Sequence, residues 1–415
     1  MSEAVAIIGV FLSIVIIMYL TRKQFPMGLN MLLASLLVGI SSGMSGFKIG
    51  SITVDSLTSP QSINLVLVVF FIGVMGELLK ETGSLDKMLN SLNILIKDNR
   101  ILIATLPSLI GMLPVPGGAI LSAPMVEEVG GKLNLSPSRM SGINMVFRHI
   151  WYLIFPLFPA IILALEMSGV PLRTFLLLNI PTTVITIVVS FFWLFRGVTN
   201  YKDSSGSPVD FKTLVNFTQS IIPLLVAVIL AIVFEVYIPL ALATGVVLAF
   251  FNYLTDSSQP VMGEIKKRVY YLKGGIKWNM IFAVVGILLY QDFIENSGVV
   301  DTISAGLVEI GIPLAVLLFL VPLLAGFFTG HNLAAFGIAY PIFGPMLPEG
   351  NAFFGFFALL YVTSMVGYLI SPVHLCLVLT REHFQAEFKK IYHELLVPVI
   401  TMLVAGVLVT VIWSI

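Results

Sequence analysis

The 415-residue chain has the composition of a membrane protein. Charged residues make up 11% of it and hydrophobic residues 58%, whereas a soluble domain carries about 25% charged residues. The formal net charge of zero argues against a nucleic-acid partner. A single cysteine, Cys376, excludes a disulfide framework and a cysteine metal site, so we expect no bound metal.

Apolar runs of about 20 residues, long enough to cross a roughly 30 Å hydrocarbon core, recur along the whole chain. The first, Val5 to Leu20, follows an acidic start and precedes Arg22 and Lys23. That order is the reverse of a signal peptide's, so we expect a retained first span. The predicted spans cover residues 4–20, 28–46, 62–80, 142–166, 174–195, 217–234, 236–254, 279–294, 352–379 and 394–414.

Between the third and fourth span of each half lies an apolar segment with turn residues at its middle, 101–125 and 311–346. The arms on either side of each turn are near the 10 to 14 residue class, which is too short for a full crossing. We therefore expect a re-entrant hairpin rather than two spans in each segment.

The two halves of the chain look like duplicates. Residues 81–86 match residues 296–301 at an offset of 215, and Pro107 finds Pro322 at the same offset. The predicted organisation is a first repeat over 1–200, a cytoplasmic linker over 201–216 and a second repeat over 217–415. Each repeat contains five spans and one re-entrant hairpin, in an all-α membrane fold.

The placement of basic residues indicates that the two repeats are inverted. Seven Lys and Arg residues lie between Lys80 and Arg148, whereas none lies between Asn279 and Thr380. Because cytoplasmic loops are enriched in Lys and Arg, corresponding loops face opposite sides of the membrane. We expect a multi-pass protein of the cell (cytoplasmic) membrane with both termini outside.

Inverted repeats with interrupted helices are typical of secondary transporters, which bind substrate near the bilayer midplane. Here the candidates are the two hairpin tips and two proline-broken helices. Proline removes a backbone hydrogen bond, and glycine lets backbone approach a ligand. The alternative for the prolines is a simple kink whose freed groups are satisfied by neighbouring helices. The predicted substrate-binding residues are Pro116, Gly117, Gly118, Pro156, Thr329, Gly330, His331, Asn332, Ser371 and Pro372.

Three segments resemble a known family: LPVPGGA at 113–119, TGHNLAAFG at 329–337 and SPVHLCL at 371–377. They are similar to an uncharacterised prokaryotic family of integral membrane proteins in the ion transporter superfamily. Gluconate and lactate permeases and divalent-anion symporters are its relatives. The resemblance implies an elevator motion of a transport domain against a scaffold, commonly in a homodimer. The Ser-Asn-Thr tip signature of dicarboxylate symporters is missing from both hairpins.

A small organic anion is the favoured substrate. The hairpin arms aim helix N-termini inward, where free amides and the positive end of the helix dipole favour anions, and neither tip contains Asp or Glu. A cation/proton antiporter is the alternative. A non-transporting intramembrane enzyme is a further alternative, although the chain lacks the common hydrolase and nucleotide-binding motifs, and no cofactor is expected.

The coupling ion is Na⁺ or H⁺. Ser122 and Asn332 offer oxygen ligands for sodium, whereas His331 and His374 are candidate proton carriers because histidine titrates near neutral pH. His149 is a third candidate, and a hydrogen-bonded structural role is the alternative for all three. No spacing such as His-x-x-x-His supports a zinc site.

Arg148 has two possible roles. It can pair with a substrate carboxylate, or it can snorkel to the membrane interface, because it lies only about 9 Å inside the predicted start of its helix. Its position near that helix start favours snorkelling.

Overall fold

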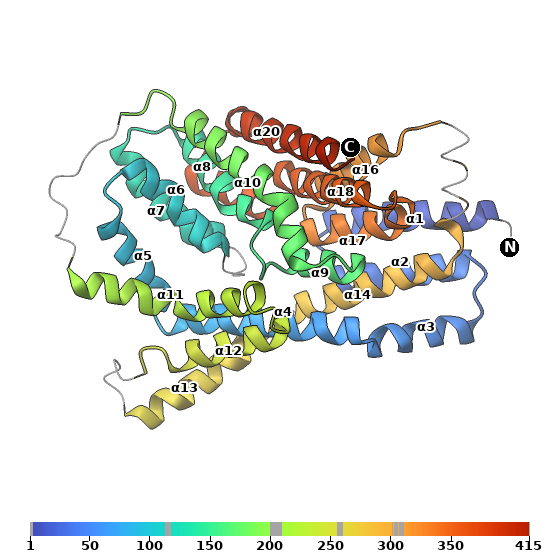
Figure 1. Cartoon of the computed structure of the whole chain (residues 1–415), viewed down its shortest axis with the longest axis horizontal. Helices are drawn as coiled ribbons and strands as arrows, with labels where there is room; N and C mark the ends of the chain where they lie inside the picture. The colour runs from blue at the N-terminus through green and yellow to red at the C-terminus, as the bar shows by residue number, and fades with distance from the viewer. Residues whose placement is uncertain are drawn as a thin grey trace.

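The computed structural model describes residues 3–112, 118–199, 210–254, 260–300, 302, 306 and 311–414. Within these ranges every regular element is a helix (Figure 1). The first half contains α1 (Glu3–Arg22), α2 (Met27–Ser41), α3 (Gly46–Thr58), α4 (Pro60–Glu81), α5 (Ser84–Leu95), α6 (Asn99–Met112), α7 (Gly118–Lys132), α8 (Pro137–His149), η1 (Ile150–Leu153), α9 (Pro159–Ser168) and α10 (Leu172–Leu194). The second half contains α11 (Phe211–Ile232), α12 (Ile238–Phe251), α13 (Val261–Gly274), α14 (Trp278–Asn296), α16 (Leu314–Thr329), α17 (Asn332–Phe343), η2 (Gly344–Met346), α18 (Asn351–Ile370), α19 (Leu375–Phe384) and α20 (Phe388–Ser414).

The protein is a multi-pass membrane protein. Seven helical stretches in the described part of the chain are long and apolar enough to cross a bilayer. They are Ala4–Arg22, Pro60–Glu81, Leu172–Leu194, Phe211–Ile232, Val261–Asn296, Asn351–Phe384 and Phe388–Ser414. The predicted spans 28–46 and 236–254 correspond to the shorter apolar helices α2 and α12.

Two predicted spans are interrupted where proline lies inside them. The segment 142–166 divides into α8, the short helix η1 and α9, and the segment 352–379 divides into α18 and α19. Ser371 has ψ 129°, the extended conformation that a following proline imposes on the preceding residue. Pro372 thus ends α18, whereas Pro156 lies in the irregular segment after η1. α-Helix resumes at Pro159 and Leu375.

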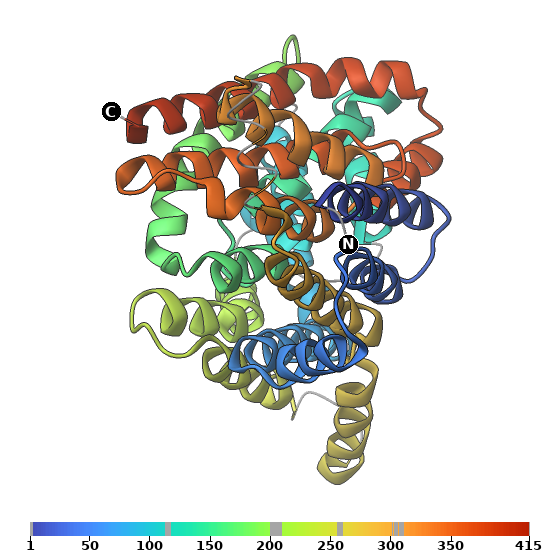
Figure 2. The same ribbon diagram turned by 90° about the vertical axis from the view of Figure 1, so that its right-hand side faces the viewer.

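Three amphipathic helices, α3, α5 and α13, were not among the predicted elements. Their sequences alternate apolar with polar residues, so they lack the long apolar run by which a span is recognised. On α3 the side chain of Phe47 is 88% exposed. Figure 2 shows α13 projecting from the main body of the molecule.

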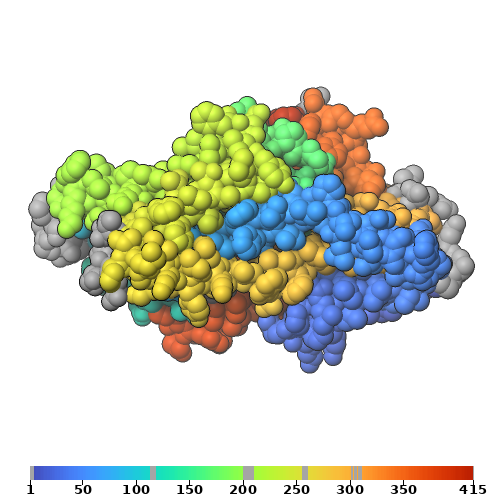
Figure 3. All heavy atoms as spheres, turned by 90° about the horizontal axis from the view of Figure 1, so that it is seen from below, coloured from blue at the N-terminus to red at the C-terminus, as the bar shows by residue number. Residues whose placement is uncertain are grey.

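Helices from both halves of the chain pack together in each of two regions. In one region α2 packs along α14, and α4 packs against α12 and α14; the face in Figure 3 shows α4 beside α11–α14. In the other region α16 and α20 pack against α18, and α8 packs against α6, α7 and α20. This second region contains both interrupted spans.

Glycine allows several helix pairs to approach backbone to backbone. An ideal Cβ on Gly286 of α14 would lie 2.8 Å from the carbonyl oxygen of Gly28 in α2. An ideal Cβ on Gly367 of α18 would lie 2.8 Å from the carbonyl carbon of Leu323 in α16. Small residues at such crossings let membrane helices pack tightly, so these positions cannot accept a side chain without separating the helices.

We predict that Gly367→Val destabilises the protein by about 1–3 kcal/mol or more, because it overpacks the α16–α18 contact. Gly50→Val is the matched control, since an added Cβ at Gly50 of α3 meets nothing within 4 Å. Thermal unfolding in detergent, with size-exclusion chromatography, measures the difference. Equal melting temperatures for the two variants would contradict this account of the crossing.

Candidate functional site

The turn between α16 and α17 contacts the break between α18 and α19. Gly330 adopts φ 65°, a left-handed conformation that glycine accepts without strain. An ideal Cβ on it would lie 3.1 Å from the backbone nitrogen of His374. The hydroxyl of Thr329 donates to the Ala325 carbonyl at 2.7 Å and lies 3.3 Å from the amide of His331, which donates to it.

The α18–α19 break is held to α16 by Ser371. Its hydroxyl donates to the carbonyl of Phe327 at 2.5 Å and accepts from the amide of Val373 at 3.3 Å. The amide of His374 donates to the carbonyl of Ser371 at 3.1 Å. The Ser371 hydroxyl therefore has a structural role in this conformation, while its neighbour Pro372 is exposed.

Two histidines lie next to each other at the ends of α8 and of the α18–α19 break. The ring centroids of His149 and His374 are 4.7 Å apart, and the rings of Tyr152 and Tyr368 lie against them. Nδ1 of His149 lies 2.7 Å from the Met145 carbonyl oxygen. Nε2 of His149 and both ring nitrogens of His374 form no well-aligned hydrogen bond with a described residue, although the His374 ring lies near the backbone of Leu369 and both residues are at most 1% exposed.

Arg148 lies beside this pair and is 2% exposed. Its Nε and Nη1 atoms have no hydrogen-bond partner in the described ranges, and no carboxylate there forms a salt bridge with it. Its guanidinium covers Gly118 at the start of α7, where an ideal Cβ would lie 2.7 Å from Nη1 and 2.8 Å from Cζ. A larger residue at position 118 would displace the guanidinium.

The expectation that Arg148 snorkels to the interface is wrong. Every residue of α8 from Met140 to His149 is buried, so the helix is enclosed by protein and its end offers no route to the surface. One signal in the sequence could have indicated a functional role for Arg148. Arg148 and His149 end α8 just before the proline-containing break, and ionisable residues inside a membrane protein commonly mark function.

Asn332 and Ser122 have different surroundings. Asn332, the first residue of α17, is 3% exposed and lies beside the hydroxyl of Tyr361, but neither of its amide atoms forms a well-aligned hydrogen bond with a described residue. The hydroxyl of Ser122 donates to Oδ1 of Asn144 at 2.6 Å, and Nδ2 of Asn144 donates to Thr380 at 2.9 Å. Ser122 thus ties α7 to α8 and, through Asn144, to α19.

The predicted site residues fall into three groups. Pro116 and Gly117 lie outside the described residues. His331 and Pro372 are exposed, and Pro156 is buried within the α8–α9 break. Gly118 lies against Arg148, and Gly330 lies against His374. Thr329 and Ser371 lie at the turn and the break that meet there, whereas Ser122 contacts Asn144 and Asn332 lies beside Tyr361.

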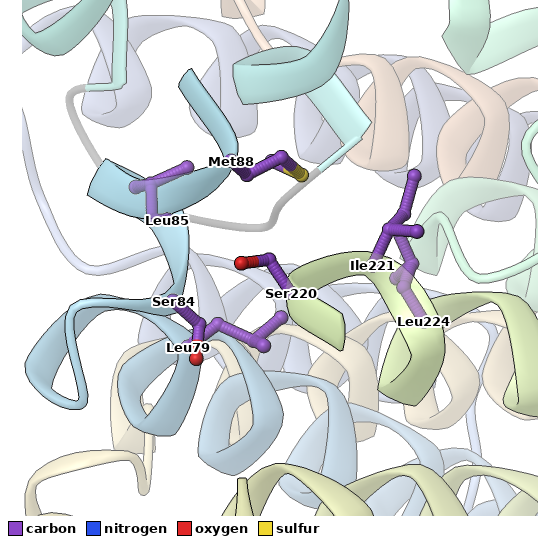
Figure 4. Close-up of a pocket in the computed structure, with 7 residues that line it drawn as sticks. All are labelled: Leu79, Ser84, Leu85, Met88, Ser220, Ile221 and Leu224. Carbon is purple, nitrogen blue, oxygen red and sulfur yellow. The ribbon is translucent and has the colours of Figure 1, made fainter. Parts of the chain in front are cut away.

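A small hollow elsewhere in the protein does not coincide with this site. It has a volume of about 10 Å³, room for about one water molecule, and lies between α4, α5 and α11 (Figure 4). It is lined by Leu79, Ser84, Leu85, Met88, Ser220, Ile221 and Leu224. The candidate site itself is closed to solvent in this conformation, because Arg148, His149 and His374 are all buried.

The fold is similar to that of a solved transporter. The crystal structure of the YdaH transporter from Alcanivorax borkumensis, described as having an unusual topology, matches with a TM-score of 0.61 over 87% of each chain, at 14% sequence identity. At this identity the likeness establishes the fold alone. No curated protein matches the sequence. Residues 4–413 match the family described as "Protein of unknown function (DUF401)", and the chain therefore belongs to that family.

Proposed function

We propose that the protein is a secondary active transporter of a small organic anion, coupled to Na⁺ or H⁺, that works by an elevator-type alternating-access mechanism. The observation that carries the proposal is the buried guanidinium of Arg148, which has no acidic partner among the described residues. An uncompensated charge in a protein interior costs several kcal/mol, and a bound anion offsets that cost. Arginine also pairs with carboxylates through two parallel hydrogen bonds.

Helix N-termini add to the attraction for an anion. α19 begins at Leu375, one residue after the buried His374, and the described part of α7 starts at Gly118, under the Arg148 guanidinium. No side chain caps the first turn of α19 or of α17, so their first amides are available to a ligand. The positive ends of these helices favour a negative group in the same space.

The helix order supports two repeats, each with five spans and one hairpin. α6 begins 215 residues before α16, and each is followed by a second hairpin arm, α7 or α17. Each hairpin is then followed by a proline-broken span and a long helix, α10 or α20. This order, the predicted inversion and the likeness in fold to a transporter favour alternating access over an enzyme. A homodimer held by the scaffold helices is part of the proposal.

The cation/proton antiporter is the competing function. It requires a carboxylate that binds the cation and exchanges the proton, whereas the described residues around Arg148 present imidazole, phenol and amide groups. The absence of a described carboxylate at this place favours the anion over a proton-exchanged alkali cation.

We predict that Arg148→Gln abolishes anion-dependent thermal stabilisation and uptake, because it removes the charge that pairs with the substrate. Arg148→Lys keeps the charge but loses the bidentate geometry, so we expect intermediate affinity. The control is Arg173→Gln, whose side chain is 55% exposed and pairs with Glu235. The measurement is a thermal-shift screen of monocarboxylates, dicarboxylates, sugar acids and phosphates, followed by proteoliposome uptake under separate sodium and proton gradients.

Two results would contradict the proposed anion site. If no anion stabilises the wild type while sodium or lithium does so with a pH dependence, the antiporter takes its place. If an anion stabilises the wild type and Arg148→Gln equally, the anion binds elsewhere.

We predict that Asn332→Ala weakens anion binding by about 1.5–3 kcal/mol, or roughly 10- to 150-fold, because it removes a hydrogen bond to a charged group. The fold should persist, since neither amide atom forms a well-aligned hydrogen bond with a described residue and alanine is a good helix former. Asn279→Ala, at an exposed position of α14, is the control. Isothermal titration with the anion found in the screen measures both variants, and unchanged affinity in Asn332→Ala would remove this residue from the site.

The inverted arrangement predicts that Lys132 and Ala352 lie on opposite sides of the membrane. Single cysteines at these positions should be modified by a membrane-impermeant thiol reagent from opposite sides in sealed vesicles. The parent chain, whose one cysteine is Cys376, reports background labelling. Modification of both positions from the same side would contradict the inversion.

A further inference from the structure

We propose that His149, His374 and Cys376 form a binding site for a zinc-class transition-metal ion. Each residue offers one ligand atom, and the three atoms all lie within 4.8 Å of one another. This proposal concerns metal binding by the protein and goes beyond anion transport. It also revises the expectation of no metal site.

The hydrogen bonding of His149 fits a metal ligand. Its Nδ1 lies 2.7 Å from the Met145 carbonyl oxygen, which can only accept, so Nδ1 carries the proton. Nε2 then carries the lone pair, and it has no partner among the described residues in a side chain that is 0% exposed. Metal-binding histidines usually donate the other ring N–H to a carbonyl or carboxylate in this way, which fixes the ring.

His374 and Cys376 supply the second and third ligands from the broken end of α19. His374 is the residue before the helix, and its side chain does not cap α19. Its ring lies near the backbone of Leu369, but neither ring nitrogen forms a well-aligned hydrogen bond within the described structure. Cys376 follows two residues later. The ring of Tyr368 lies 3.9 Å from that of His374 between centroids, and Tyr152 lies 5.1 Å from His149, so aromatic rings limit access of water.

The ligand set selects the class of metal. Two imidazoles and one thiolate suit Zn²⁺ or Cu⁺, whereas Mg²⁺ and Ca²⁺ prefer oxygen ligands. Zinc takes four ligands in tetrahedral geometry, and sites with three protein ligands keep the fourth position for water or a small ligand. The site is therefore of the open type.

The positive charge of Arg148 acts on this site, because Arg148 is the neighbour of His149 in the chain and interacts with its ring. The guanidinium repels a bare cation. Cysteine binds a metal as the thiolate, and the negative charge of that ligand partly neutralises the ion. An anion in the fourth position would compensate both the metal and Arg148.

The sequence alone did not reveal the site because its two histidines are far apart in the chain. His149 and His374 are separated by 225 residues and belong to different halves of the protein. Metal motifs are recognised by short spacings within one element, whereas this set is assembled by the contact of two interrupted spans.

The test uses the full chain, purified in detergent and stripped with a chelator, then titrated with Co²⁺. Tetrahedral cobalt bound to a thiolate shows visible d–d bands and a sulfur-to-cobalt charge-transfer band in the near ultraviolet. We expect both bands at one equivalent, and their loss on addition of Zn²⁺. Cys376→Ser should remove the charge-transfer band and weaken zinc binding at least about tenfold, and His374→Asn should weaken it similarly.

His393→Asn is the matched control, because the side chain of His393 is 64% exposed and lies near Glu394 rather than in the cluster. It should bind cobalt and zinc as the wild type does. Cobalt binding without a sulfur band, or wild-type zinc affinity in Cys376→Ser, would overturn the proposal. Anion stabilisation measured on the metal-free protein is independent of these results, so failure of the metal site and failure of the anion transporter are distinguishable.

Discussion

The buried charge of Arg148 is the constraint on which the candidate site depends. A guanidinium that is 2% exposed and has no acidic partner among the described residues cannot be stable without compensation in the resting protein or in a complex. The positive ends of nearby helices add to the charge of the guanidinium. No described carboxylate forms a salt bridge with Arg148. A substrate anion would bind because it neutralises this uncompensated positive charge. A carrier requires such a site, to which its substrate binds reversibly.

The fold places this charge by interrupting helices. Pro156 and Pro372 lie in the breaks between α8 and α9 and between α18 and α19, and α16 turns at Gly330 against the second break. Gly118 lets the guanidinium lie directly on backbone at the start of α7. The structural bonds of Ser371 and Ser122 hold these pieces in register, so the polar side chains in the site divide into those that build it and those left for a ligand.

Much of this arrangement could be predicted from the sequence. Apolar runs gave the long helices, and proline and glycine gave the breaks and the second tip, because these residues act locally on the backbone. The amphipathic helices α3, α5 and α13 and the role of Arg148 could not be predicted this way. Burial of Arg148 depends on how α6, α7 and α20 surround α8, which is a property of packing between segments distant in the chain.

An experimental structure determined with the stabilising anion tests the central claim most directly. We expect density for the anion within hydrogen-bond distance of the Arg148 guanidinium, in contact with the N-terminal backbone of α7 or α19. A structure in which Arg148 pairs with a carboxylate side chain or faces lipid, with the anion bound elsewhere, would contradict the account.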